Sequence, residues 1–282
     1  MTSIIIPAHN EEAVIARTLE TLHPGVVSRE IEVIVVCNGC NDKTAEVCRG
    51  FTGVTVIETA EAGKTNALNI GDATASSFPR IYLDADIVIT LECIREISSV
   101  LTSERALLAA PTAINRTDSS SWAVKQFYGI ADNLSFAKEG VGTSGVYAMS
   151  ESGRRRFSLF PKVISDDGFV RIQFEPAERL TLKTQYSIVS TPRNLRSLIA
   201  IKTRSYLGTY ELIQLYPQLW SNSGRTNTSS LIKLMRRPRN WLGVSIYVYA
   251  TIRARAAARD RFRNNVKSWD RDHSSRQAEE RL

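Results

Sequence analysis

The stretch that decides the fold is Ser3-Ile-Ile-Ile-Pro-Ala-His-Asn-Glu-Glu12. Its β-branched run predicts a buried strand over residues 3–8, and the polar residues after it predict a helix that begins near Asn10, a frequent helix cap. Similar short runs recur along the chain and alternate with longer amphipathic segments, at residues 31–37, 54–58, 80–83 and 106–111. This alternation predicts an α/β fold with a Rossmann-like, mostly parallel sheet flanked by helices.

Composition is that of a globular protein. Of 282 residues, 43% are hydrophobic and 23% are charged, which argues against disordered and low-complexity classes. The apolar stretch at residues 241–252 is shorter than the roughly 20 residues that a membrane-spanning helix needs. The start of the chain lacks the basic segment of a secretory signal, so we expect a cytoplasmic protein. Cys37 and Cys40 have a zinc-like spacing, but no second pair follows, and a structural metal is not expected there.

Polar clusters follow three of the predicted strands, at residues 7–12, 38–42 and 84–86. Ligands of open parallel sheets bind beyond the carboxyl ends of the strands, so we expect these clusters to meet in one crevice. Asp84 and Asp86 offer the hard oxygen ligands that suit Mg²⁺ or Mn²⁺ bridging phosphates. The same Asp-x-Asp spacing occurs at Asp270 and Asp272 in the tail, which shows that the strand-end context, not the spacing, singles out the first pair.

Four stretches together carry a resemblance. They are Ser3 to Glu12, Val35-Val-Cys-Asn-Gly-Cys-Asn-Asp-Lys-Thr44, Gly63-Lys-Thr-Asn-Ala-Leu-Asn-Ile-Gly71 and Tyr82-Leu-Asp-Ala-Asp86. In order and spacing they resemble the nucleotide-sugar half of family 2 glycosyltransferases with the GT-A fold, over roughly residues 1–175. The resemblance implies a metal at Asp84 and Asp86, and a donor site formed by Pro7, Ala8, Asn10, Glu11, Asn38, Asp42, Lys64, Asp84 and Ala85.

One departure leaves the donor base open. Family members commonly carry Asp-Asp-Gly-Ser where this chain has Cys37-Asn-Gly-Cys40. The Asn38 amide can both donate and accept hydrogen bonds, so UDP and GDP both remain candidate donor nucleotides.

The resemblance continues on the acceptor side. Gly142-Thr143-Ser144-Gly145 is similar to the acceptor loop of the family, and Ser165-Asp-Asp-Gly168 resembles its Glu-Asp motif. This implies that Asp167 is the catalytic base, that Asp166 takes the place of the Glu, and that one base and one metal invert the anomeric carbon. Paired acids at a helix N-terminus are also favoured by the helix dipole alone.

The predicted organisation is a GT-A catalytic domain at residues 1–195 and a basic, mainly helical extension at residues 196–282. Residues 1–111 form the nucleotide-sugar half of the domain, and residues 112–195 form the acceptor half. Where processive synthases carry Gln-x-x-Arg-Trp, this chain has Lys202-Thr-Arg-Ser205. A single sugar addition is therefore expected, with Lys202 and Arg204 as candidate contacts of the diphosphate.

The extension is strongly basic. Residues 233–267 hold ten Lys or Arg residues and one acid, Asp260. A basic and aromatic segment predicts peripheral contact with the inner face of the membrane, which suits a lipid-linked acceptor, although a sugar acceptor and a merely solvated helix face also fit. No recognised nucleic-acid module accompanies the charge, so nucleic acid is not an expected partner.

The expected function is inverting, metal-dependent transfer of a sugar from a nucleoside-diphosphate sugar, in cell-surface glycan or glycolipid synthesis. A sugar-nucleotide nucleotidylyltransferase is an alternative, but it would carry a Gly-rich phosphate loop after the first strand, where this chain has Pro7-Ala-His-Asn10. A non-catalytic binding or scaffold protein of the same fold at the membrane surface is the other alternative. A dinucleotide oxidoreductase is disfavoured, because no Gly-x-Gly-x-x-Gly follows the first strand.

Overall fold

The computed structural model describes residues 1–224 and 227–264. Their strands form one seven-stranded sheet of order β3-β2-β1-β4-β6-β5-β7. The strands are β1 (Thr2–Ala8), β2 (Ile31–Asn38), β3 (Thr55–Thr59), β4 (Arg80–Leu83), β5 (Leu108–Arg116), β6 (Val146–Met149) and β7 (Arg179–Ser190). Among these strands, β6 alone runs antiparallel to its neighbours β4 and β5. The predicted mostly parallel α/β sheet is confirmed.

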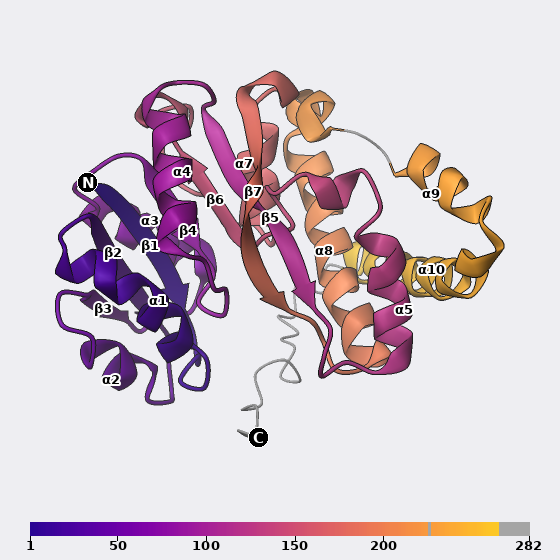
Figure 1. Cartoon of the computed structure of the whole chain (residues 1–282), viewed down its shortest axis with the longest axis horizontal. Coiled ribbons are helices and arrows are strands. Elements are labelled where there is room, and N and C mark those ends of the chain that lie inside the picture. The colour runs from indigo at the N-terminus through magenta and orange to yellow at the C-terminus, as the bar shows by residue number, and fades with distance from the viewer. Residues whose placement is uncertain (225–226, 265–282) are drawn as a thin grey trace.

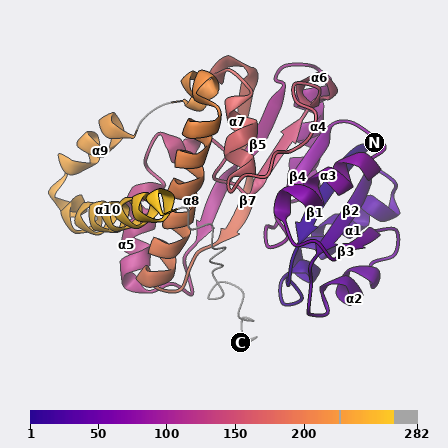
Figure 2. The same cartoon turned by 180° about the vertical axis from the view of Figure 1, so that it is seen from behind.

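Helices cover both faces of this sheet and make up most of the chain after β7 (Figures 1 and 2). The α-helices are α1 (Ile15–Val27), α2 (Thr44–Arg49), α3 (Lys64–Thr74), α4 (Leu91–Thr102), α5 (Trp122–Ala131), α6 (Glu151–Arg154), α7 (Asp166–Ile172), α8 (Leu195–Leu215), α9 (Thr228–Met235) and α10 (Trp241–Arg263). Short 3₁₀ segments are η1 (Phe136–Lys138), η2 (Pro176–Glu178), η3 (Pro217–Ser223) and η4 (Pro238–Asn240). None of the described helices is both long enough and apolar enough to cross a bilayer.

The core lies on both faces of the sheet because successive strand residues point to opposite sides. Ile4 and Ile6 of β1 belong to a buried cluster with α1 and α4, whereas Ile5 belongs to a second cluster with α3 and α7. All seven residues of β1 are buried, as expected for a central parallel strand covered on both faces. The central strands are thereby held rigidly, and their carboxyl ends form a fixed edge.

The helices after β7 pack on the far end of the sheet from β3 (Figure 1). Val124 and Phe127 of α5, Leu198 of α8 and Ala250 of α10 form a third buried cluster. The predicted helical character of the extension is confirmed for its described residues, 196–224 and 227–264, while the proposed boundary between residues 195 and 196 stays a prediction. Asp270 and Asp272 lie outside the described residues.

Two local expectations differ from the structure. The strand β7 was not anticipated, because it is an edge strand in which only Leu182 and Ser187 are buried, and its sequence therefore lacks a clear apolar run. The expected helix cap at Asn10 is wrong. Asn10 has a left-handed backbone with φ of 52°, its side-chain Oδ1 accepts from the Asn41 N–H at 2.8 Å, and α1 begins only at Ile15.

Candidate active site

The loops after β1 and β2 are tied together by the Asn38 side chain. Its Nδ2 donates to the Ala8 carbonyl at 2.8 Å, and its Oδ1 accepts from the Gly63 N–H at 2.9 Å, directly before α3. Pro7 and Ala8 are the last residues of β1, and both are buried. Asn38 therefore joins three of the predicted donor-site segments, and its amide is already occupied by backbone partners.

A second set of bonds fixes the segment around Glu11 and Asp42. The Glu11 N–H donates to Thr44 Oγ1 at 2.7 Å, and the Thr44 N–H and hydroxyl both donate to Asp42 Oδ1. Burial by itself raises the pKa of the Asp42 carboxyl, but the bonds from Thr44 and from the Glu12 N–H outweigh it and lower that pKa. Glu11 is 4% exposed, and Asp42 is half-buried and bonded to Thr44. Both acids therefore stabilise the loops around the crevice.

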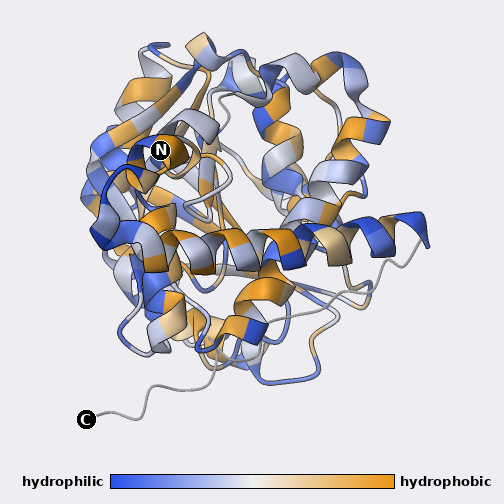
Figure 3. Cartoon of the chain, turned by 90° about the vertical axis from the view of Figure 1, so that its right-hand side faces the viewer, coloured by the Kyte–Doolittle hydropathy of each residue, from blue (hydrophilic) through white to orange (hydrophobic). Residues whose placement is uncertain are grey.

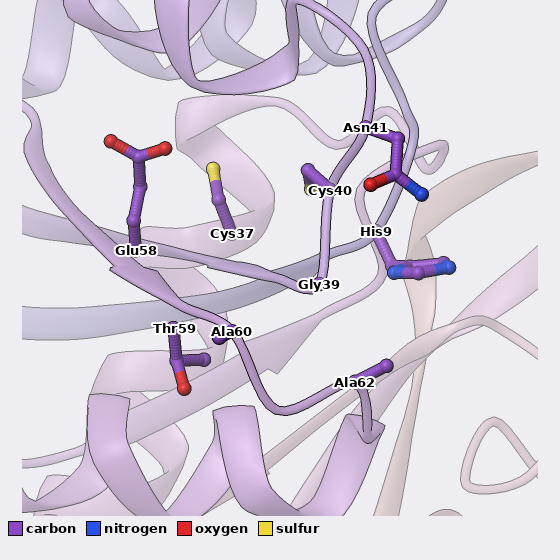
Figure 4. Close-up of a pocket in the computed structure, with 9 residues that line it drawn as sticks. All are labelled: His9, Cys37, Gly39, Cys40, Asn41, Glu58, Thr59, Ala60 and Ala62. Carbon is purple, nitrogen blue, oxygen red and sulfur yellow. The ribbon is translucent and has the colours of Figure 1, made fainter.

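A pocket of about 600 Å³ opens beside these loops, at the ends of β1, β2 and β3 (Figure 4). Its lining consists of small and polar residues: His9, Cys37, Gly39, Cys40, Asn41, Glu58, Thr59, Ala60 and Ala62. The contribution of Glu58 and Thr59 was missed from sequence, although both stand at the end of a predicted strand, the position at which ligand contacts are expected.

At the next strand end, Lys64 joins two carboxylates that are distant in sequence. Its Nζ lies 2.7 Å from Oδ1 of Asp84, just after β4, and 2.9 Å from Oδ1 of Asp166, the first residue of α7. Burial alone would lower the pKa of the ammonium, but the charges of Asp166, Asp84 and Asp167 outweigh it and raise that pKa. Lys64 thus remains a cation and joins the predicted donor half of the chain to the predicted acceptor half.

Asp166 is the buried member of the pair that begins α7. Its side chain is 5% exposed, Lys64 occupies one oxygen, and the Tyr147 hydroxyl donates to the other at 3.0 Å. Burial raises the pKa of the Asp166 carboxyl, the charge of Lys64 opposes that shift, and the neighbouring carboxylates of Asp167 and Asp84 add to it. Because both carboxylate oxygens of Asp166 already have partners, this residue serves to position Lys64.

Asp167 is differently placed. Its Oδ1 accepts from the Ser165 hydroxyl and from the Gly168 N–H, each at 2.7 Å. In the described part of the chain no group donates a hydrogen bond to its Oδ2, and a Cβ placed on Gly142 would stand 3.7 Å from that atom. Glycine at position 142, where φ is +90°, therefore keeps the approach to this oxygen open. Asp167 offers one free carboxylate oxygen to the crevice.

The predicted acceptor loop, Gly142 to Gly145, reaches Asp84 through its backbone. The Gly145 carbonyl accepts from the Asp84 N–H at 3.0 Å, and Gly145 has a φ of +65°. The Thr143 hydroxyl donates to the Glu139 carbonyl, and the buried Ser144 hydroxyl donates to the carbonyls of Gly140 and Val146. The two hydroxyls stabilise the loop.

The turn after β4 is held from behind by α1. Thr18 Oγ1 donates to the Ala85 carbonyl at 2.8 Å, and Arg17 Nη2 donates to the Asp86 carbonyl at 3.0 Å.

No group of three or more His, Cys, Asp or Glu side chains within residues 1–224 and 227–264 could hold a metal ion by itself. Two carboxylates fit the way in which Mg²⁺ is held when phosphates and water complete its shell. The Asp84 side chain is 38% exposed and accessible to such a ligand.

The two basic candidates of α8 are separated. Lys202 Nζ lies 5.9 Å from the ring centroid of Phe127 on α5, and burial lowers the pKa of its ammonium, against the charge of Asp132. Arg204 lies on another face of α8, the same face as Gly208, which follows four residues later. A Cβ placed on Gly208 would lie 2.9 Å from Ser165 Cβ. Helical spacing thus places Arg204 on the face of α8 that meets Ser165, whereas the contacts described for Lys202 are with α5.

A buried network behind the site was also missed from sequence. Asp72 of α3 accepts from the Tyr82 hydroxyl at 2.5 Å and forms ion pairs with Arg80 and Arg154, both at 2.8 Å. The Tyr82 ring stacks on Tyr147 at a centroid distance of 5.0 Å, which links this network to Asp166. The one available signal was Asp72 itself, an acid four residues after Leu68 on the buried face of a predicted helix.

Comparison with known proteins gives consistent matches. Residues 3–172 match the family described as Glycosyl transferase family 2. A probable glycosyltransferase of Bacillus subtilis (strain 168), YdaM, is 29% identical over 133 residues, which are 40% of this chain and 32% of that protein. The chain therefore spans about a third of the length of this curated relative.

Two solved structures share the fold. The mannosyltransferase PcManGT from Pyrobaculum calidifontis, in complex with GDP-Man and Mn²⁺, superposes with a TM-score of 0.60 at 18% identity and covers 95% of this chain and 76% of its own. S. aureus TarS in complex with UDP gives a TM-score of 0.56 at 13% identity, over 93% of this chain and 89% of its own.

Proposed function

The chain belongs to glycosyl transferase family 2, and on that premise we propose that it moves a sugar from a nucleoside-diphosphate sugar to an acceptor hydroxyl with inversion. The observation that carries this proposal is the contact of Lys64 with Asp84 and Asp166. It brings the donor-side carboxylate and the acceptor-side acids to one point of the crevice, beside the free oxygen of Asp167.

The donor nucleotide is proposed to lie along the strand ends. The nucleoside occupies the pocket of about 600 Å³, which has room for a base and a ribose. The diphosphate then reaches the turn of Asp84 and Asp86, where Lys64 and Arg204 offset its charge. Mg²⁺ or Mn²⁺, held by Asp84 and Asp86, would supply further positive charge to the departing diphosphate. Solved structures of the same fold hold GDP-Man with Mn²⁺ in one case and UDP in another, which supports UDP and GDP as the candidates.

The base is proposed to be Asp167. Its Oδ2 takes the proton of the acceptor hydroxyl while that oxygen bonds to the anomeric carbon and the bond from this carbon to the diphosphate oxygen breaks. The bonds from Ser165 and Gly168 to Oδ1 fix the carboxylate and direct Oδ2 toward Gly142. Asp166 positions Lys64, because its two oxygens are already bound and its side chain is buried.

The acceptor is proposed to be a sugar or a lipid-linked sugar that receives a single residue, in the synthesis of a surface glycan or glycolipid. The supporting observation is Lys202-Thr-Arg-Ser205, which stands in place of the Gln-x-x-Arg-Trp motif of processive synthases. Lys202 and Arg204 are two residues apart on α8, so helical spacing supports different roles for them, with Arg204 on the same face as Gly208.

The first experiment is calorimetric titration of UDP and GDP, with and without Mn²⁺. We expect metal-dependent binding of one nucleotide, weakened about tenfold or more in Asp84→Asn. Asp118→Asn, which changes an exposed aspartate far along the chain, is the matched control and should bind as the native chain does. Binding without metal would remove the metal from the proposal, and binding of neither nucleotide would favour a non-catalytic domain.

Catalysis is tested separately with Asp167→Asn. This variant should bind the nucleotide normally and lose about 10²- to 10⁴-fold in hydrolysis of the nucleotide sugar that carries the preferred base, since only the base is removed. Loss of nucleotide binding in this variant, or unchanged hydrolysis, would contradict the assignment of Asp167. Release of pyrophosphate from a nucleoside triphosphate and a sugar phosphate would instead support a nucleotidylyltransferase.

A further inference from the structure

An exposed apolar surface lies on α9, η4 and α10, which we call the α9–α10 surface. Six large apolar residues on it are between 49% and 62% exposed: Ile232, Met235, Trp241, Leu242, Tyr249 and Ile252. The helix α9 contributes no buried residue to the protein core. Soluble domains commonly expose single apolar residues. Six large ones on two consecutive helices form a group of the kind that marks an interaction surface.

The same surface carries the net charge of the protein. Residues 233–264 contain nine Lys or Arg residues and one acid, Asp260, while the rest of the chain is close to neutral, with 27 basic and 28 acidic side chains. Four cations precede α10 and three more are exposed along its second half: Lys233, Arg236, Arg237, Arg239, Arg253, Arg259 and Arg263. Arg255 is instead used in packing, because its guanidinium lies 5.0 Å from the ring centroid of Tyr206 on α8.

The helix α10 divides into a packed face and an outward face. Its buried residues are Gly243, Val244, Ala250, Ala254 and Ala258, and it packs against α5 and α8. Leu242, Tyr249 and Ile252 are spaced at seven and three residues, which places them together on the outward side. Figure 3 shows α10 lengthwise, with hydrophobic residues along it and hydrophilic residues gathered toward its C-terminal end. The Trp241 indole N–H donates to the Met235 carbonyl at 3.0 Å, which joins α9 to α10.

We propose that the α9–α10 surface binds an anionic membrane as a peripheral contact. The apolar side chains would enter the interfacial layer, and the arginines around them would lie at the level of the lipid phosphates. A second copy of the chain fits less well, because a self-complementary contact would place two strongly positive surfaces against each other. Nucleic acid would leave Leu242, Tyr249 and Ile252 unmatched.

The proposal goes beyond the proposed function and places the site relative to the bilayer. The helix α10 packs on α8, and α8 contacts the start of α7 at Gly208 and Ser165. The bound face is therefore on the acceptor half, at the opposite end of the sheet from β3 and the pocket beside it (Figure 1). Donor nucleotide would enter from the aqueous side, and an acceptor embedded in lipid would approach from the other.

The charge part is tested by flotation of the purified full chain with vesicles of phosphatidylcholine alone or mixed with phosphatidylglycerol. The native chain should float with the anionic vesicles and stay unbound with neutral ones at moderate salt. Arg236→Gln with Arg237→Gln should weaken the partition about 25-fold, at about 1 kcal/mol per cation and 1.4 kcal/mol per tenfold. Arg105→Gln with Lys183→Gln removes two exposed charges elsewhere and should leave binding unchanged.

The apolar part is tested with Leu242→Ser and Ile252→Ser together. Binding to anionic vesicles should fall about tenfold or more, whereas Val27→Ser with Leu159→Ser, which are 68% and 66% exposed, should bind normally. Circular dichroism and nucleotide titration check that each variant is folded, so that failure of the membrane proposal is distinct from failure of the donor site.

Equal binding to neutral and anionic vesicles, or none to either, would overturn the proposal. So would a native dimer in sedimentation velocity that becomes monomeric in the Leu242→Ser, Ile252→Ser variant, because the surface would then be covered by a second copy.

Discussion

Replacing Lys64 by methionine should destabilise the protein in a pH-dependent manner. The variant keeps the length and apolar stem of the side chain but removes the ammonium that lies 2.7 Å from Asp84 and 2.9 Å from Asp166. Asp84 can turn to water, because its side chain is 38% exposed. Asp166 cannot, because its side chain is 5% exposed, and it would be left as a buried charge with Tyr147 as its remaining described partner.

The size of the effect follows from that asymmetry. Removing one partner of a fully buried ion pair costs about 3–5 kcal/mol. Lys64 itself is 27% exposed, so water can replace part of the lost interaction. We therefore expect the free energy of unfolding to fall by about 2–3 kcal/mol near pH 8, measured from urea unfolding curves.

The sign of the pH dependence is set by Asp166. Its folded-state pKa is raised by burial, so the cost of its buried charge is absent below the unfolded pKa and fully present above the folded one. Without Lys64 the folded pKa rises further, and the carboxyl takes up its proton at a higher pH. The pKa of Lys64 is raised, so the native ammonium stays charged throughout. The difference between variant and native chain should therefore shrink as the pH falls from about 8 to 5.

Two further variants make the measurement decisive. Lys43→Met removes an exposed lysine at the start of α2 and should change stability by less than about 0.5 kcal/mol at every pH. Adding Asp166→Asn to Lys64→Met removes the unpaired charge and should restore most of the loss. A pH-independent loss in Lys64→Met, or a loss no larger than that of Lys43→Met, would refute the argument that Lys64 stabilises a buried charge.

Other contacts of the site give separate expectations. Tyr147→Phe removes a hydrogen bond to a buried carboxylate and should lower the free energy of unfolding by about 1.5–3 kcal/mol in urea titrations; an unchanged midpoint would show that this bond is not formed. Arg204→Ala should weaken binding of the preferred nucleotide about tenfold in calorimetry. Lys202→Ala should leave that binding unchanged, since the contacts of Lys202 are with α5; equal effects of the two variants would contradict their separation on α8.

Much of this arrangement could be predicted from sequence because it depends on local patterns. The strand β4 was predicted to the residue, since a short, mainly apolar run between polar segments is a signal carried by neighbouring residues. The position of Asp84 then followed from the rule that ligands meet parallel sheets at their carboxyl ends. The family assignment used the spacing of such stretches, and the match over residues 3–172 confirms it.

The rest depended on contacts between distant parts of the chain. Tyr147 is 19 residues from Asp166, and Arg154 is 82 residues from Asp72, so no local pattern could pair them. The different roles of Asp166 and Asp167 could not be predicted either. They depend on the contacts of Tyr147 and Lys64, which both bind the carboxylate of Asp166. Asn10 looked like a helix cap from its neighbours, but the distant Asn41 takes its side chain.

The reversed direction of β6 has a consequence for how this protein could be altered. Because β6 opposes β4, residues 140–145 enter the sheet at the edge where β4 ends, and a main-chain hydrogen bond joins the Asp84 N–H to the Gly145 carbonyl. The loop is thus fastened to the donor side by backbone atoms, which any sequence supplies. Grafting a different loop between Glu139 and Val146, with glycine kept at positions 140, 142 and 145, should exchange acceptor preference as a module while the donor machinery stays in register.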